Sequence, residues 1–261
     1  MLFELGGKRK RLIQVIYSVL AGLMFIALVG FGIGGATSGG IFDALGIGGG
    51  SSGSDPQYSQ QIDNANQALQ QDPKDDKALL KLARYNFLEG QAALQTDDQG
   101  RVTLSQDSLD SYRAATDAWE RYLKTDPKKP NDDVAGLMIK VYSTSAGTDP
   151  ASLESDVNGA YESAKIVADA RPSLGAYTDL ATWAYLSGNT EAGDQAKQKA
   201  LKEAPDSTTK KQIETQLKQA QQQRQLVVKA LKKSAPDQSQ LQDPLSGLSG
   251  GTSGALPGAT P

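Results

Sequence analysis

GAYTDLATWAYLSGNTEAGDQAKQKALKEAP, residues 175–205, is the stretch that decides the predicted fold. Small and apolar residues recur in it at the spacing of a helix face, roughly three or four residues apart. Gly188 and Asn189 interrupt the pattern with a turn signal, and Pro205 ends it because proline cannot continue a helix. The stretch therefore predicts two helices joined by a tight turn. The residues that carry the pattern are Tyr177, Leu180, Ala181, Ala184, Gly193, Ala200 and Leu201.

The same kind of ending occurs three more times along the chain. Apolar helical faces also stop at Pro73, Pro127 and Pro172. Twelve residues before the four prolines stand, in chain order, Gln61, Ala115, Ala160 and Gly193. Three of these four residues are small, as a close crossing of two helices requires. The chain therefore contains a series of similar helical units.

This series resembles the tetratricopeptide repeat, a helix–turn–helix unit of about 34 residues. The best copy is 175–205, although Lys197 stands where the family usually has an aromatic residue. The resemblance implies an all-α solenoid that binds proteins, and an ordinary helical bundle is the alternative. The other helices are expected to fall as follows: 76–90 pairs with 111–127 across an insertion near 91–110, 134–145 pairs with 153–170, and 57–71 stands unpaired at the start.

A last helix is predicted over 207–233, with one apolar stripe and a polar back. The stripe consists of Ile213, Leu217, Ala220, Val227 and Leu231, and Arg224 interrupts it. A helix of this kind suits the end of a solenoid, because a terminal repeat must present a polar face to water. A coiled-coil arm is the alternative. Strand signals are nearly absent from the chain, since short β-branched alternations are missing.

The N-terminal region carries the pattern of a membrane anchor. Lys8, Arg9, Lys10 and Arg11 precede an uncharged, mostly apolar run over residues 12–34. As a helix this run would cover ~34 Å, enough for a hydrocarbon core of ~30 Å. Basic residues collect on the cytoplasmic side, so residues 1–11 are expected inside and the rest of the chain outside. A cleaved signal peptide is the competing interpretation, but its apolar region would be shorter, about 7–15 residues.

Composition divides the remaining chain into three parts. Residues 35–55 are rich in Gly and Ser and predict a flexible linker. Residues 56–233 form the predicted folded domain, and residues 234–261 read as a disordered tail rich in Pro, Gly and Ser. Small residues four apart, at Ser18 and Gly22, would let two anchors pack closely, so a homo-oligomer through the anchor is an open possibility.

Residue content excludes several classes of function. The chain has no Cys and no His, which removes disulfides, thiolate and imidazole chemistry and the commonest zinc ligands. No motif surrounds its Ser, Lys or acidic residues, so we expect no enzyme, no cofactor and no metal. Residues 1–34 hold four basic and one acidic residue; since the net charge is −3, the rest carries −6. An acidic body argues against nucleic acid as a partner.

The repeat alignment predicts a peptide groove lined by the first helices of two units. The candidate positions are Lys77, Leu80, Arg84, Phe87, Thr178, Thr182 and Tyr185. Phe87 and Tyr185 either anchor a partner in the groove or pack against neighbouring helices. Trp119 falls at a core position and is expected to be structural.

The layout is similar to that of bacterial single-pass tetratricopeptide proteins associated with the Sec translocon. That resemblance implies a plasma-membrane protein whose C-terminal domain is extracytoplasmic and binds proteins or peptides, with a chaperone-like role. The alternative is a structural cell-envelope or division component that oligomerises through its anchor.

Overall fold

A computed structural model describes residues 56–96, 102–146, 148 and 152–234. Within these residues the fold is all-helical apart from one short hairpin, as the sequence predicts. None of the helices found there has the length and apolar character needed to cross a membrane. The predictions for residues 1–11, for the anchor over 12–34, for the linker over 35–55 and for the tail beyond residue 234 lie outside the described residues.

The helices are α3 (Pro56–Gln71), α4 (Asp76–Ala92), α5 (Gln106–Leu123), α6 (Asp132–Ser145), α7 (Leu153–Ala170), α8 (Leu174–Ser187), α9 (Thr190–Glu203) and α10 (Ser207–Ser234).

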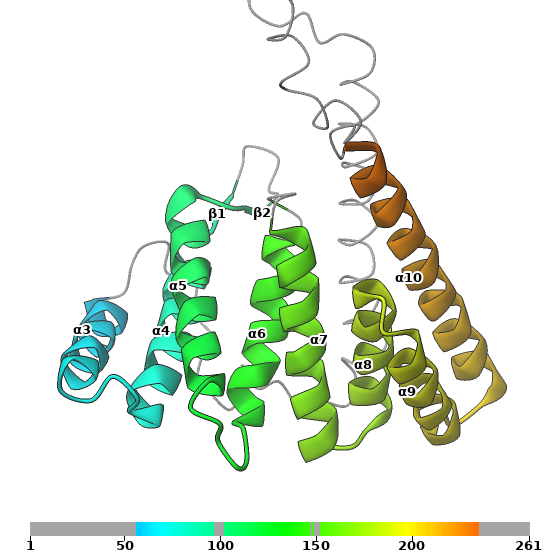
Figure 1. The fold of residues 1–261 in the computed structure, drawn as a ribbon, viewed down its shortest axis with the longest axis horizontal. Helices are drawn as coiled ribbons and strands as arrows, with labels where there is room; N and C mark the ends of the chain where they lie inside the picture. The colour runs from blue at the N-terminus through cyan, green and yellow to red at the C-terminus, as the bar shows by residue number, and fades with distance from the viewer. Residues whose placement is uncertain (1–55, 97–101, 147, 149–151, 235–261) are drawn as a thin grey trace, which may run out of the picture.

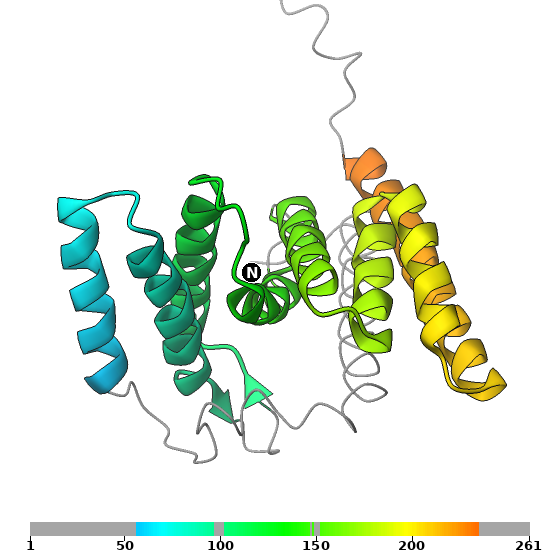
Figure 2. The same cartoon turned by 90° about the horizontal axis from the view of Figure 1, so that it is seen from below.

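The helices stand in a row in chain order (Figure 1). Three antiparallel pairs, α4 with α5, α6 with α7 and α8 with α9, pack as the sequence predicts. Across the described residues each helix contacts only helices one or two places away in the chain, and the view from below shows the same order (Figure 2). Such neighbour-only packing is typical of a solenoid, whereas a closed bundle would bring its first and last helices together.

Short polar side chains start several of the helices. An oxygen of each cap residue accepts a backbone N–H from the first turn, which satisfies a donor that the helix leaves free. These caps are Asp75 for α4, Ser105 for α5, Asn131 for α6 and Ser173 for α8. At the other end of α8, Gly188 adopts a left-handed φ of 93°, which forms the turn that the Gly188–Asn189 pair predicts.

In each of the three helix pairs, a tyrosine ring on one helix packs directly against a glycine on the other. An added Cβ would meet the ring of Tyr112 at Gly90, of Tyr142 at Gly159 and of Tyr185 at Gly193. The small residues predicted at the helix crossings, Ala115, Ala160 and Gly193, are indeed buried. Trp119 is also buried, which confirms its structural role.

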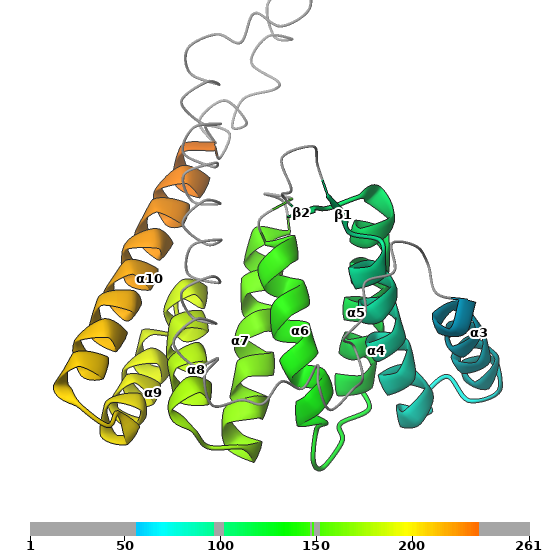
Figure 3. The same cartoon turned by 180° about the vertical axis from the view of Figure 1, so that it is seen from behind.

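The C-terminal helix α10 packs against α8 and α9. Ile213, Leu217 and Ala220 are buried in that contact, and the side-chain amide of Gln216 lies 3.5 Å from the Thr182 hydroxyl of α8. With 28 residues against 14 in α8, α10 projects beyond its neighbours (Figures 1 and 3). Over residues 213–220 it is therefore a packed terminal helix and not a free arm.

The insertion between α4 and α5 contains an antiparallel hairpin that the sequence did not predict. Its strands are β1 (Gln95–Thr96) and β2 (Val102–Thr103), paired Gln95 with Thr103 and Thr96 with Val102. Val102 is 63% exposed, so the hairpin adds little to the core.

Candidate functional site

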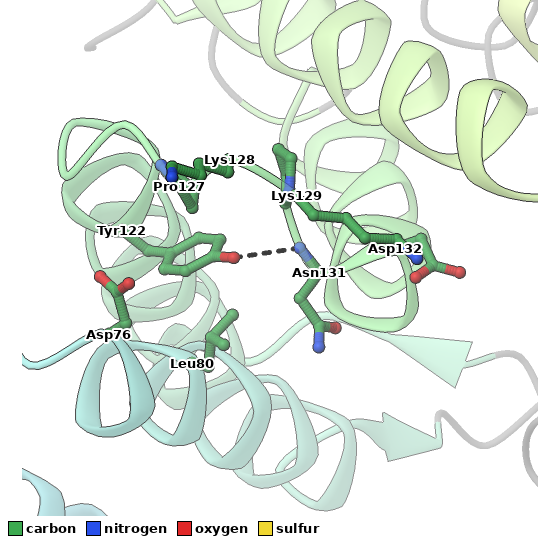
Figure 4. Close-up of a pocket in the computed structure, with 9 residues that line it drawn as sticks. Asp76, Leu80, Tyr122, Pro127, Lys128, Lys129, Asn131 and Asp132 are labelled. Atoms are coloured by element: carbon green, nitrogen blue, oxygen red, sulfur yellow. Dashed lines mark hydrogen bonds between the residues drawn. The ribbon is translucent and has the colours of Figure 1, made fainter.

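A cleft of about 460 Å³ opens where the first two helix pairs meet (Figure 4). Its walls come from the start of α4, the end of α5 and the loop that leads into α6. The loop contributes most of the lining. The residues around the cleft are Asp76, Leu80, Tyr122, Pro127, Lys128, Lys129, Pro130, Asn131 and Asp132.

Local sequence fixes the shape of this loop. Asp126 has a left-handed φ of 57°, a conformation that Asp tolerates better than most residues, and it turns the chain away from α5. Pro127 and Pro130 then restrict the backbone on both sides of two lysines. The Asn131 side chain accepts the Val134 N–H at 2.9 Å and begins α6. Lys128 and Lys129 are therefore held on a constrained segment between two helices.

Tyr122 joins the loop to α5. Its hydroxyl accepts the backbone N–H of Asn131 at 3.1 Å (Figure 4). Burial raises the pKa of Tyr122; the nearby Asp76 charge raises it further, while the bond from Asn131 lowers it. The phenol therefore stays protonated at neutral pH. Because the hydroxyl accepts the loop N–H, its own hydrogen remains available for donation.

The two carboxylates at the cleft already have partners. Asp76 accepts the Thr125 hydroxyl at 2.6 Å. Asp132 pairs with Arg171 at 2.7 Å, and the same guanidinium reaches Asp133 at 3.2 Å. In contrast, no residue of the described part of the chain forms an ion pair with Lys128 or Lys129, both of which are exposed. The cleft therefore combines two lysines that have no ion-pair partner among the described residues with one aspartate held by a hydroxyl and one paired with arginine.

The structure brings only part of the predicted groove to this cleft. Leu80 lines it and is half-buried, with Lys77 exposed one turn earlier on the same helix. Arg84 is half-buried and is not part of the cleft lining.

The other four predicted groove residues are buried, so the expectation that they face an open groove is wrong. Phe87 stacks on Tyr112 of α5, with ring centroids 6.3 Å apart. Tyr185 packs on Gly193 and donates to Asp194 at 2.6 Å. Thr178 and Thr182 donate to carbonyls one turn earlier in α8, and α10 approaches Thr182. Phe87 and Tyr185 thus pack against neighbouring helices, which is the second of the two alternatives that the sequence left open.

The sequence prediction missed the loop side of the cleft. Lys128, Lys129 and Asn131 lie outside every predicted helix, so helical periodicity carries no signal for them. The signal was present as two lysines between two prolines in Asp-Pro-Lys-Lys-Pro-Asn, residues 126–131. Proline-flanked charged residues in a short connection mark an ordered, exposed loop.

The arrangement is suited to binding. Apolar surface from Leu80 lies beside hydrogen-bond donors, and no nucleophile paired with a base lines the cleft. Within the ranges that the structure describes, no cluster of three or more acidic side chains is placed to hold a metal ion.

Comparisons with known proteins found no match for the chain among family models, curated proteins or solved structures.

Proposed function

We propose that this chain is a protein-binding scaffold of the tetratricopeptide type, and that the cleft beside Leu80 is its binding site. The observation that carries the proposal is the cleft itself, at the junction of two packed helix pairs. Its volume of about 460 Å³ falls in the range of ligand sites, ~300–1,000 Å³. A cleft of this size holds a few side chains of an extended segment rather than a whole folded partner.

The proposal places this scaffold at a bacterial plasma membrane. The support comes from the sequence, in which Lys8 to Arg11 precede the apolar run over 12–34. In this arrangement residues 56–233 are extracytoplasmic and receive exported proteins near the Sec translocon, in a chaperone-like role. Protease added to intact spheroplasts should then degrade residues 56–233 and leave only a short anchored fragment. Full protection of the chain would contradict this placement.

The binding part of the proposal is tested with the full-length chain on an array of overlapping peptides from exported proteins. Leu80→Lys fills the apolar wall of the cleft with a charged chain while keeping a helix-compatible residue in α4. Val102→Lys is the control, because it also replaces an apolar residue by lysine, on an exposed side chain of the hairpin.

The scaffold proposal predicts that the unmodified chain binds a defined subset of peptides. Leu80→Lys should weaken this binding by about tenfold or more, since a charge is placed against apolar surface. Val102→Lys should bind the same subset as the unmodified chain. Absence of binding to every peptide, or equal loss in both variants, would contradict the proposal.

A further inference from the structure

We propose that the cleft takes an extended protein segment in which acidic side chains flank an apolar one. This inference rests on the proposed scaffold function and names the chemistry of the partner at the same site. It is carried by the charges around the cleft, by the partners those charges already have, and by the position of Leu80 among them.

The charged side chains at the cleft differ in the partners they have. The carboxylates of Asp76 and Asp132 are engaged by Thr125 and Arg171. Lys128 and Lys129 have no ion-pair partner among the described residues, although the chain as a whole is acidic. The attraction for an anionic side chain therefore comes from these two exposed ammonium groups, since the lining as a whole also carries the Asp76 and Asp132 carboxylates.

The hydrogen-bond inventory points the same way. The side-chain oxygen of Asn131 caps α6, which leaves its amide N–H groups free to donate. The hydroxyl of Tyr122 accepts from the loop and can donate its own hydrogen. Asn131 and Tyr122 thus offer donors at the cleft, and carboxylates of Asp or Glu are the protein side chains that only accept.

Leu80 lies in the wall formed by α4, and the lysines lie on the loop across from it (Figure 4). In an extended segment neighbouring side chains point in opposite directions, so alternate residues reach different walls. A segment that places one apolar residue between acidic ones can contact Leu80 and both lysines together.

The experiment measures fluorescence anisotropy of a labelled probe, Ser-Asp-Glu-Leu-Asp-Glu-Ser, with the full-length chain. The second probe is the neutral counterpart Ser-Asn-Gln-Leu-Asn-Gln-Ser. The test variant is Lys128→Glu with Lys129→Glu. The matched control is Lys210→Glu with Lys211→Glu, another adjacent and exposed lysine pair, at the start of α10.

The inference predicts that the acidic probe binds about tenfold more tightly than the neutral probe, because two exposed charge pairs act together. The loop variant should abolish this preference. The α10 variant should keep the preference. Raising the salt concentration should reduce the preference as well, since exposed charges are screened.

The outcomes separate this inference from the scaffold proposal. Equal affinity for both probes, or an acidic preference that survives in the loop variant, would overturn the acidic-segment inference while leaving the scaffold intact. Binding of neither probe, together with an array on which no peptide binds, would contradict the scaffold proposal itself. Vesicles of anionic phospholipid serve as a third arm: loop-dependent binding to vesicles without binding of the acidic probe would also overturn the inference.

Discussion

The ring of Tyr185 on α8 packs so closely against Gly193 on α9 that a Cβ at position 193 would lie 2.7 Å from a ring carbon. The hydroxyl of the same tyrosine donates to Asp194 at 2.6 Å. The equivalent contact occurs between Gly159 and Tyr142 in the preceding pair. Each helix pair therefore crosses at a point where one helix carries no side chain, and the crossing fixes how the pair presents its outer face.

Replacing Gly193 by Ala should destabilise the protein. The added methyl must displace the Tyr185 ring, and overpacking of this kind costs about 1–3 kcal/mol in free energy of unfolding. Gly136→Ala is the matched control, because a Cβ there meets nothing within 4 Å in helix α6. That control should gain about 0.5–1 kcal/mol from helix propensity. Urea denaturation followed by circular dichroism measures both, and equal effects at the two sites would contradict the crossing.

Two leucines of α10 test its role as a packed terminal helix. Leu217 is 1% exposed and Leu226 is 45% exposed. Leu217→Ala should lower the free energy of unfolding by about 2–5 kcal/mol because it leaves a cavity in the core. Leu226→Ala should change it by less than about 0.5 kcal/mol. Comparable losses in thermal and urea unfolding would mean that α10 does not pack as described.

Asp179 gives the protein a pH dependence. It is the sole charged residue of α8, and burial raises its pKa to about 7. The folded state therefore retains this proton up to a pH near 7, whereas the unfolded chain releases it near 4. The carboxyl contributes most to stability below pH 4, and its contribution falls as pH rises from 4 to 7.

Asp179→Asn removes this titration. The free energy of unfolding of the variant should equal that of the unmodified chain at low pH and exceed it at pH 8. Because a shift of one pKa unit corresponds to ~1.4 kcal/mol, the difference at pH 8 should be at most a few kcal/mol. Urea unfolding at a series of pH values measures the difference. A difference that stays constant across the range would show that Asp179 does not titrate in this window.

The Arg171 ion pair should influence binding at the cleft from a distance. Arg171→Met frees the Asp132 and Asp133 carboxylates and adds one net negative charge, which then repels an acidic segment. Affinity for the acidic probe should fall about threefold, the size expected for one exposed charge, while the neutral probe is unaffected. Adding Asp132→Asn to Arg171→Met should restore the affinity.

Arg224→Met is the control for the loss of an arginine, since Arg224 pairs with Glu154 away from the cleft. It should leave the affinity for both probes unchanged. A loss in the Arg171 variant that Asp132→Asn does not restore would point to altered structure rather than charge.

Helix positions were predictable because proline stops and 3.6-residue periodicity are local properties of the sequence. The predicted helix over 153–170 coincides with α7, and the one over 57–71 differs from α3 by a single residue. The hairpin formed by β1 and β2 was missed, since two-residue strands carry no periodic signal.

The candidate site was less predictable because it depends on which elements meet in space. Phe87 and Leu80 both lie on α4, yet Tyr112 covers Phe87 while Leu80 stays at the cleft. Helical spacing identifies a face and does not identify the neighbour that covers it. The contribution of Lys128 and Lys129 depends on a left-handed residue at Asp126, a property that the sequence leaves undetermined.

Backbone hydrogen exchange of the full-length chain, with and without the saturating acidic probe, tests the central claim most directly. The account predicts slower exchange in two separate segments, the start of α4 around 76–80 and the loop over 125–132, with little change in α8 to α10. If the probe binds and exchange slows elsewhere, or nowhere in these two segments, the cleft is not the binding site.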